Sequence, residues 1–324
     1  MGRLGVTLTL VAAVAYSNVA AAQDYPTRPI TLIVPFTAGG PTDLVGRIIA
    51  DRIKTGLGQP VVVENVPGAG GSIGAARVAK AAPDGYTLIV GQWSSHVGAG
   101  AMYSLSFHPV EDFAPVALLT SSPLWIVGRK DLPANNLQEL IAWLKANPDK
   151  ATAGSVGVGS GTHLCLIYFQ NNAGVRFQVV PYRGGPPMMQ DLIAGQVDFS
   201  CPESSQNLAQ YRSGQIKVFA VMSRQRWAAA PEIPTVDEAG VPGMHFPFWN
   251  ALWAPKGTPE PIVAKLNAAV KEAFADPAMQ KRFGELGYDI PPREQQSPDA
   301  LATFHRQEVE KWWPIIKGAN IKAE

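Results

Sequence analysis

The chain has 324 residues and a formal net charge of +1, from 27 lysines and arginines against 26 aspartates and glutamates. This near-neutral balance argues against a nucleic-acid partner, which requires a basic face. The length is sufficient for two domains with large cores. Its two cysteines, Cys165 and Cys201, are too few for a disulfide framework, and spacing alone does not decide whether they pair.

The N-terminal segment has the pattern of a secretory signal peptide. Arg3 is its only charge, an apolar stretch follows, and Ala20–Ala22 offers a small-residue cleavage site before Gln23. We therefore predict export to the periplasm after removal of residues 1–22, which leaves a mature net charge of 26 − 26 = 0. No other run reaches the roughly 18 apolar residues that a membrane-spanning helix requires.

The first folded unit is a short strand from Thr31, a glycine loop and an amphipathic helix. The strand stops at Pro35, the loop contains Gly39 and Gly40, and Thr42 is predicted as the N-cap of the helix. The apolar stripe of that helix recurs at helical spacing in Leu44, Val45, Ile48, Ile49, Ile53 and Leu57. A loop of this kind leaves unpaired backbone amides that point at one place, which makes an anion site without any charged side chain.

Strands and helices then alternate along the chain. Short strands are predicted at 61–64 and 87–90, with a helix at 73–82 between them, so βαβ units and a mostly parallel sheet are expected. A polar and aromatic loop, Gln92–His96, follows the third strand. The second block repeats the first design at Ala153–His163, where a strand and a glycine loop lead into a helix that stops near 174.

The remaining predicted elements complete this alternating pattern. Further strands are predicted at 124–127, 179–182, 196–201, 216–222 and 248–253. Further helices are predicted at 137–145, 188–194, 261–275, 277–286 and 298–316.

Two enzymatic interpretations centre on the glycines around Ser72. Gly70–Gly74 matches the G-x-S-x-G nucleophile elbow, in which the serine directly follows a strand. Five loop residues, 66–70, intervene here, so a periplasmic serine hydrolase using Ser72 stands as the alternative function and not as the favoured one. The same glycines resemble a dinucleotide fingerprint, but their spacing does not fit.

The histidines do not indicate a metal site. They lie at positions 96, 108, 163, 245 and 305, with no pair at ligand spacing. His96 suits a loop anchor better than a general base. The tryptophan beside it, Trp93, has two open interpretations: its ring stacks on a flat ligand in a cleft, or it packs away from the cleft.

Motifs spread over nearly the whole chain point to one family. In order they are Tyr25–Ile30, Val34–Asp43, Glu64–Asn65 leading into Pro67–Gly71, Ala82–Tyr86, Pro181–Gly184, Gly195–Asp198, Pro234–Thr235 with Glu238–Gly240, and Ala254–Pro259. This series resembles the solute-binding proteins of tripartite tricarboxylate transporters, also called the Bug family. The chain departs from the usual family pattern at Trp93 and at Ala251, where a glycine is common.

The resemblance implies an α/β fold of the type II periplasmic-binding-protein class, with two Rossmann-like domains and a ligand cleft between them. It places residues 23–123 and 248–324 in the first domain and residues 124–247 in the second. It also implies a non-enzymatic protein without a cofactor, which captures a small organic carboxylate and delivers it to a membrane permease. The identity of the carboxylate is left open.

Family members hold a carboxylate through backbone amides and bridging waters of two loops, which correspond here to Phe36–Gly40 and Gly159–His163. The far end of the ligand is expected to meet Gln92–His96 and the strand-end loop Cys201–Ser205. The complete set of expected ligand-binding residues is Phe36, Thr37, Ala38, Gly39, Gly40, Asp43, Gln92, Trp93, Ser94, Ser95, His96, Gly159, Ser160, Gly161, Thr162, His163, Cys201 and Ser204.

Overall fold

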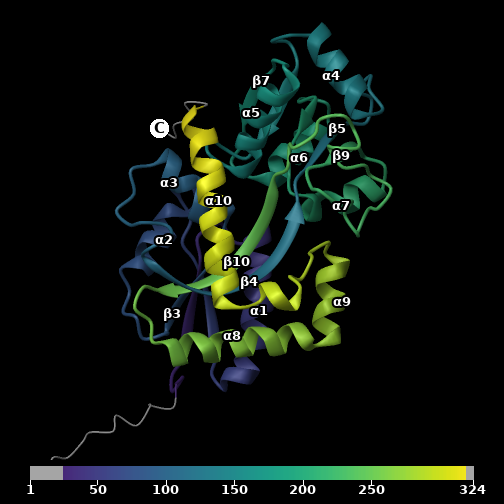
Figure 1. Ribbon diagram of the computed structural model, residues 1–324. Coiled ribbons are helices and arrows are strands. Elements are labelled where there is room, and N and C mark those ends of the chain that lie inside the picture. The colour runs from purple at the N-terminus through teal and green to yellow at the C-terminus, as the bar shows by residue number, and fades with distance from the viewer. Residues whose placement is uncertain (1–24, 319–324) are drawn as a thin grey trace, which may run out of the picture.

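The computed structural model describes residues 25–318, which form two lobes, each built around a five-stranded sheet (Figure 1). The signal peptide predicted at residues 1–22 lies outside these described residues. Within 25–318, no helix combines the length and the apolar composition needed to cross a membrane.

Lobe 1 holds the sheet nearest the N-terminus. Its strands are β1 (Ile30–Val34), β2 (Val61–Asn65), β3 (Thr87–Gln92), β4 (Phe113–Pro123) and β10 (Pro247–Pro255). They lie in the order β2-β1-β3-β10-β4. β1 pairs in parallel with β2 and β3, as the predicted βαβ units require, whereas β10 runs antiparallel to β3 and β4.

Lobe 2 holds the second sheet. Its strands are β5 (Trp125–Arg129), β6 (Thr152–Ser155), β7 (Gln178–Pro181), β8 (Phe199–Ser200) and β9 (Ile216–Val221). They lie in the order β7-β6-β8-β5-β9, with β6 parallel to β7 and β8 and with β5 antiparallel to β8 and β9. Both sheets are therefore mixed, and the prediction of an α/β fold is confirmed.

The strands β4 and β10 carry the chain between the lobes. β4 is 11 residues long and was not predicted, because Pro115 near its start breaks the pattern of a strand. The proline is tolerated since β4 lies at the edge of its sheet. The chain enters lobe 2 after Pro123 and returns at Pro247, so we propose a first domain of residues 23–123 and 248–324 and a second of residues 124–247.

Helices cover both faces of the sheet in lobe 1. On one face lie α1 (Pro41–Leu57) and α8 (Glu260–Ala275), whose apolar stripes pack in one core with the sheet. On the other face lie α2 (Ser72–Ala79) and α10 (Pro298–Gly318), the long helix at the front of Figure 1. The short helix α3 (Ala99–Met102) and α9 (Pro277–Glu285) complete the lobe.

Lobe 2 has four helices in the described chain, and the sequence predicted three of them. These three are α4 (Leu137–Ala146), α5 (Gly161–Ala173) and α6 (Gly185–Ile193). The fourth is α7 (Ser204–Arg212), whose first two residues belong to the predicted strand-end loop Cys201–Ser205 and for which the sequence predicts no helix. Its first turn begins with two serines that resemble turn residues, while Leu208 anchors the helix in the core of the lobe.

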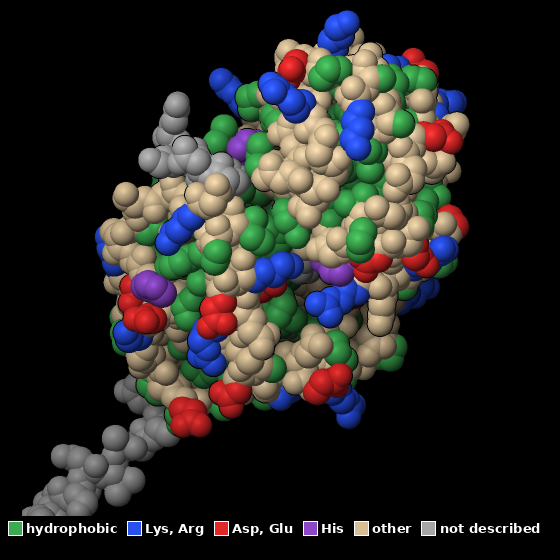
Figure 2. All heavy atoms as spheres, turned by 45° about the horizontal axis from the view of Figure 1, so that its top comes forward, with side chains coloured by type: hydrophobic (Ala, Val, Ile, Leu, Met, Phe, Trp, Pro, Cys, Tyr) green, Lys and Arg blue, Asp and Glu red, His purple; other side chains and the backbone are tan. Residues whose placement is uncertain are grey.

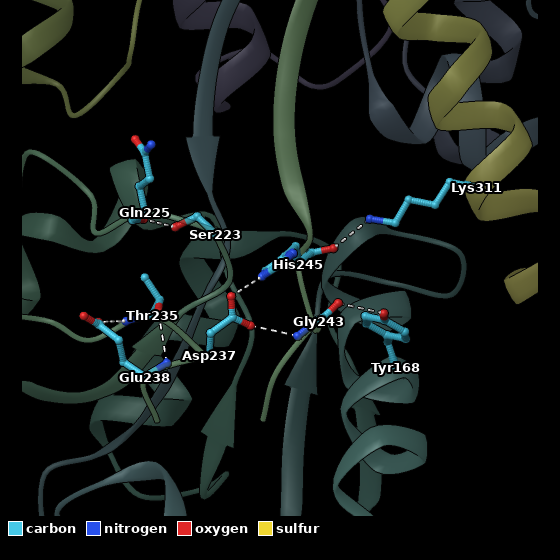
Figure 3. A network of polar contacts seen from close by, with 9 residues as sticks. All are labelled: Tyr168, Ser223, Gln225, Thr235, Asp237, Glu238, Gly243, His245 and Lys311. Atoms are coloured by element: carbon cyan, nitrogen blue, oxygen red, sulfur yellow. Dashed lines mark hydrogen bonds and ion pairs between the residues drawn. The ribbon is translucent and has the colours of Figure 1, made fainter. Parts of the chain in front are cut away.

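Polar contacts join α10 of lobe 1 to lobe 2 close to the returning strand (Figure 3). Lys311 Nζ donates to the carbonyl of His245 at 3.2 Å, and His245 Nε2 lies 2.9 Å from a carboxylate oxygen of Asp237. The amide of Gly243 donates to Asp237 at 2.7 Å, and the Tyr168 hydroxyl of α5 donates to the Gly243 carbonyl at 3.2 Å. Figure 2 shows a hollowed waist between the lobes with lysine, arginine and histidine side chains beside it.

Candidate functional site

The two predicted glycine loops have the same position in their lobes. In lobe 1, β1 ends at Val34 and α1 begins at Pro41, with Gly40 as its N-cap. Thr42, which was predicted as the N-cap, is instead the second residue of the helix. Proline suits the first helical position because its φ is preset and it has no amide hydrogen to lose, so the helix starts two residues earlier than predicted.

Side chains hold the loop of lobe 2 in shape. Ser160 is the N-cap of α5: its Oγ accepts from the amide of His163 at 3.1 Å and donates to the Gly157 carbonyl at 2.7 Å. His163 Nδ1 accepts from the amide of Gly159 at 3.3 Å, and burial lowers the pKa of this imidazole. The neutral ring therefore acts as an acceptor that fixes the loop.

Asp43 holds the loop of lobe 1 from behind. Its carboxylate accepts from the amide of Gly39 at 2.8 Å, from Arg47 Nε at 2.9 Å and from Asn65 Nδ2 at 2.9 Å. Asn65 Nδ2 also donates to the Phe36 carbonyl at 3.0 Å. Burial alone would raise the pKa of the Asp43 carboxyl, but the hydrogen bonds from Arg47, Gly39 and Asn65 together lower it. Asp43 is thus an ionised support of the loop.

Several backbone amides of the two loops remain without an acceptor among residues 25–318. In lobe 1 they belong to Thr37, Ala38 and Thr42, and in lobe 2 to Gly161 and Thr162. Each group lies at the N-terminus of a helix, where the helix dipole adds about half a positive charge. Each lobe therefore offers a site suited to an oxyanion.

Contacts across the waist bring the two loops toward each other. A Cβ placed on Gly159 of lobe 2 would lie 3.1 Å from Met102 Sδ and 3.6 Å from the Tyr103 hydroxyl of lobe 1. Tyr103 also borders Gly70, where an added Cβ would lie 3.4 Å from its ring. The next residue, Gly71, packs against the Phe36 ring. Sequence patterns gave no signal for Met102 or Tyr103, because lone residues at the end of a short helix carry no motif.

The expected polar loop at Gln92–His96 is not a loop. Gln92 ends β3, and residues Ser94–Gly98 form a single π-helical turn that is fully buried. Trp93 is 0% exposed and packs against Phe246, with ring centroids 4.7 Å apart. This burial supports the interpretation that the tryptophan packs in the core.

His96 lies in the same buried turn. It stacks on Trp253 with ring centroids 3.9 Å apart, and its Nδ1 is 2.9 Å from Ser95 Oγ. Burial, with a smaller contribution from His305, holds the pKa of His96 well below its ordinary value. His96 is thus a neutral core side chain.

The strand-end loop of lobe 2 contains a disulfide. Cys201 is bonded to Cys165 of α5, with the two Cα atoms 6.2 Å apart. Ser204 opens α7 and is 0% exposed, and its hydroxyl has no partner among the described residues. Beside it lies Glu203, a residue that sequence patterns did not single out. It is buried and accepts from the hydroxyl of Ser122 on β4 at 2.7 Å, so it joins the crossing strand to lobe 2.

The structure gives no support to a serine nucleophile at Ser72. This residue opens α2 and is separated from the end of β2 by a glycine turn, as its spacing indicated. In the described part of the chain, no histidine is hydrogen-bonded to it. No group of three metal-binding side chains occurs among residues 25–318 either.

Comparison with known proteins agrees with this geometry. The profile of the tripartite tricarboxylate transporter family receptor matches residues 45–321. The periplasmic binding protein BugD is 38% identical with a TM-score of 0.84, over 93% of this chain and 100% of its own. MatC from Rhodopseudomonas palustris, solved with malate, is 39% identical with a TM-score of 0.83, over 90% of this chain and 100% of its own. An R. palustris protein solved with adipate is 34% identical with a TM-score of 0.85, over 92% and 99% of the two chains.

Proposed function

The chain belongs to the family of tripartite tricarboxylate transporter receptors, and we propose that it captures a small organic carboxylate between its lobes and hands it to the membrane permease of such a transporter. The family is one of periplasmic solute-binding proteins and not of enzymes. The suspected resemblance and the two-domain periplasmic-binding-protein fold are thereby confirmed.

The observation that carries the proposal is the pair of helix N-termini, one in each lobe. The free amides of Thr37, Ala38 and Thr42 in lobe 1 can donate hydrogen bonds to an oxyanion, and so can those of Gly161 and Thr162 in lobe 2. Two such ends provide several donors and fractional positive charge, but no full cation, which suits a carboxylate that must be released again. The relatives solved with malate and adipate support this ligand class.

A ligand held by both loops favours closure of the lobes. Because one loop belongs to each lobe, a carboxylate that bonds to both adds contacts that only the closed arrangement makes. The crossing strands β4 and β10 are the connections about which the lobes can bend. We propose that the permease recognises this closed form, and that export and cleavage after residue 22 bring the protein to the periplasm.

We propose different roles for the expected ligand-binding residues. Direct contact is assigned to the loop residues whose amides are free, together with Gln92 at the end of β3 and Ser204 at the start of α7. Support of the loops is assigned to Phe36, Gly39, Gly40, Asp43, Gly159, Ser160 and His163. Packing is assigned to Trp93, Ser94, Ser95, His96 and Cys201.

The free amides of the two loops are together called the amide clamp, and a proline substitution at Gly161 tests it. Gly161 is the first residue of α5, a position that proline favours. Ser160 before it is extended at φ −69° and ψ 160°, a conformation that the residue before a proline can adopt. Gly161→Pro removes one donor, whereas the matched variant Gly161→Ala adds a side chain and keeps the amide. A hydrogen bond to a charged group contributes about 1.5–3 kcal/mol.

We therefore expect Gly161→Pro to bind carboxylates at least ~10-fold more weakly than Gly161→Ala at similar melting temperature. Isothermal titration calorimetry with the acids selected by a thermal-shift panel of mono-, di- and tricarboxylates gives the ratio. Equal affinity of the two variants would show that the clamp is misplaced. Turnover of an ester that is abolished by Ser72→Ala, with no carboxylate binding, would favour the hydrolase alternative.

A further inference from the structure

A row of buried polar side chains crosses the end of the sheet in lobe 1. Asn250 of β10 pairs in register with Gln92 of β3 on one side and with Thr120 of β4 on the other. Asn250 Nδ2 donates to Thr120 Oγ1 at 3.1 Å. All three residues are less than 10% exposed. The row lies at the end of the sheet where β4 and β10 carry the chain to and from lobe 2, so it is close to the waist between the lobes.

The row lies on the face of the sheet that α1 covers. The neighbouring Gly91 faces the opposite side, where an added Cβ would lie 2.2 Å from the His96 ring, and side chains alternate along a strand. On the α1 face, Gly46 sits over Val34, 2.9 Å from an added Cβ. Thr42 is one turn earlier on the same face of α1, nearer to the end of the strands at which Gln92 lies.

Two buried side-chain atoms, one on α1 and one on β10, have no hydrogen-bond partner among the described residues. They are the hydroxyl oxygen of Thr42 and the side-chain carbonyl oxygen of Asn250, and both residues are 1% exposed. A buried polar group without a partner costs about 1–3 kcal/mol. One of the two, the Thr42 hydroxyl, belongs to the α1 N-terminus that carries the free amides, so a molecule bound there can supply a missing partner.

We propose that Thr42 and Asn250 form a subsite that reads a hydroxyl group on the carbon next to the clamped carboxylate, so that the protein selects 2-hydroxycarboxylates. This subsite rests on the proposed carboxylate clamp. A hydroxyl matches the two groups because it donates to Asn250 Oδ1 and accepts from the Thr42 hydroxyl. The subsite adjoins the clamp because Thr42 contributes to both: its amide belongs to the clamp and its side chain to the subsite.

An ammonium group fits this subsite less well than a hydroxyl. A buried cation needs a countercharge, and the nearby carboxylate of Asp43 is already engaged by Arg47 at 2.9 Å. The N-terminus of α1 also carries the positive end of the helix dipole, which disfavours a cation. The subsite therefore discriminates against 2-amino acids as well as against unsubstituted acids.

Pairs of acids of equal length test the subsite in the wild-type protein. The pairs are lactate with propionate, malate with succinate, 2-hydroxyglutarate with glutarate, and 2-hydroxyadipate with adipate, and aspartate serves as the amino counterpart of malate. At the chain length that binds, we expect the hydroxy acid to bind at least ~10-fold more tightly than its partner, because the unsubstituted acid leaves both buried groups unpaired. Calorimetry measures each affinity.

Variants then assign the discrimination to the two residues. Thr42→Val removes the hydroxyl with almost no change of shape, and Asn250→Leu removes the amide; each should reduce the affinity ratio of the hydroxy acid to its partner toward one. Thr42→Ser keeps a hydroxyl and should keep the ratio well above that of Thr42→Val. Melting temperatures confirm folding, and Thr42→Val alone suffices if Asn250→Leu does not fold.

The outcomes separate this inference from the proposed function. Equal binding of both members of every pair overturns the subsite and leaves the clamp intact. An unchanged ratio in Thr42→Val also overturns it. If none of the acids binds, the proposed function fails, and the subsite fails with it.

Discussion

Among single residues, His305 shows how burial sets a response to pH. This histidine of α10 is 3% exposed, and its Nε2 lies 2.7 Å from the His96 carbonyl, to which it donates. Burial lowers its pKa from 6.5 to about 4. The folded protein therefore keeps the ring neutral at pH values where the unfolded chain binds a proton.

We expect this histidine to make the protein less stable in acid. Its contribution is complete above pH 6.5 and is lost as the pH falls toward 4, by about 1.4 kcal/mol per pH unit and about 3 kcal/mol in all. Urea unfolding at several pH values between 7.5 and 4.5 measures the slope. His305→Gln keeps a donor for the His96 carbonyl and does not titrate, so its slope should be smaller. Equal slopes would mean that other groups control the acid response.

Residue roles were only partly predictable from the sequence. The two glycine loops were recognisable because strand, glycines and helix stripe follow one another within a few residues. Trp93 and His96 were misleading, since a polar stretch after a strand resembles a loop and only the surrounding core shows that it is buried. Thr42 and Asn250 were not singled out as hydroxyl readers, because their free atoms become visible only when α1 is placed over the sheet.

At the scale of elements, the disulfide ties α5 to the strand end that precedes α7. Cys165 and Cys201 are 36 residues apart in sequence, and both are almost fully buried. Closing a loop of this length in the unfolded chain corresponds to about 4 kcal/mol of stabilisation in the chain-entropy description. We expect the double variant Cys165→Ala/Cys201→Ala to lose a stability of this order in urea unfolding under oxidising conditions.

A matched experiment uses the wild-type protein and a reductant. Because the bond is buried, dithiothreitol should leave the folded protein unchanged. It should reduce the bond in unfolded molecules, where the sulfur atoms are exposed, and thereby lower the urea midpoint. The double variant should be insensitive to dithiothreitol. A wild-type protein whose urea midpoint is the same with and without reductant would show that the bond contributes nothing to stability.

Elements with a clear apolar periodicity, or with glycine or proline at their ends, were predictable from the sequence. Elements that depend on tertiary contacts were not. The apolar stripe of α1 and the glycine after α5 mark those helices in the sequence. β4 lacks such marks, since it has a proline at its third residue and then runs through residues that are mostly buried on both faces. Such a strand is recognisable only from its pairing with β10, which is 130 residues away in sequence at the Thr120–Asn250 pair.

At the scale of the whole molecule, the proposed closure of the lobes depends on how near the two glycine loops can come. Gly159 has φ +77° and approaches Met102 of the other lobe, where an added Cβ would lie 3.1 Å from the sulfur. A side chain at this position therefore acts in two ways. It strains the backbone, which costs about 1–2 kcal/mol, and it also separates the lobes.

Gly174 provides a control for the strain alone. It ends α5 at φ +61° in the same lobe, and no atom lies within 4 Å of an added Cβ. We expect Gly159→Ala and Gly174→Ala to lose similar stability in urea unfolding. Only Gly159→Ala should also weaken ligand binding, by about 10-fold if closure becomes ~1.4 kcal/mol less favourable. Small-angle X-ray scattering with ligand should then show a less compact Gly159→Ala protein. Equal affinities of the two variants would mean that the contact at Met102 does not limit closure.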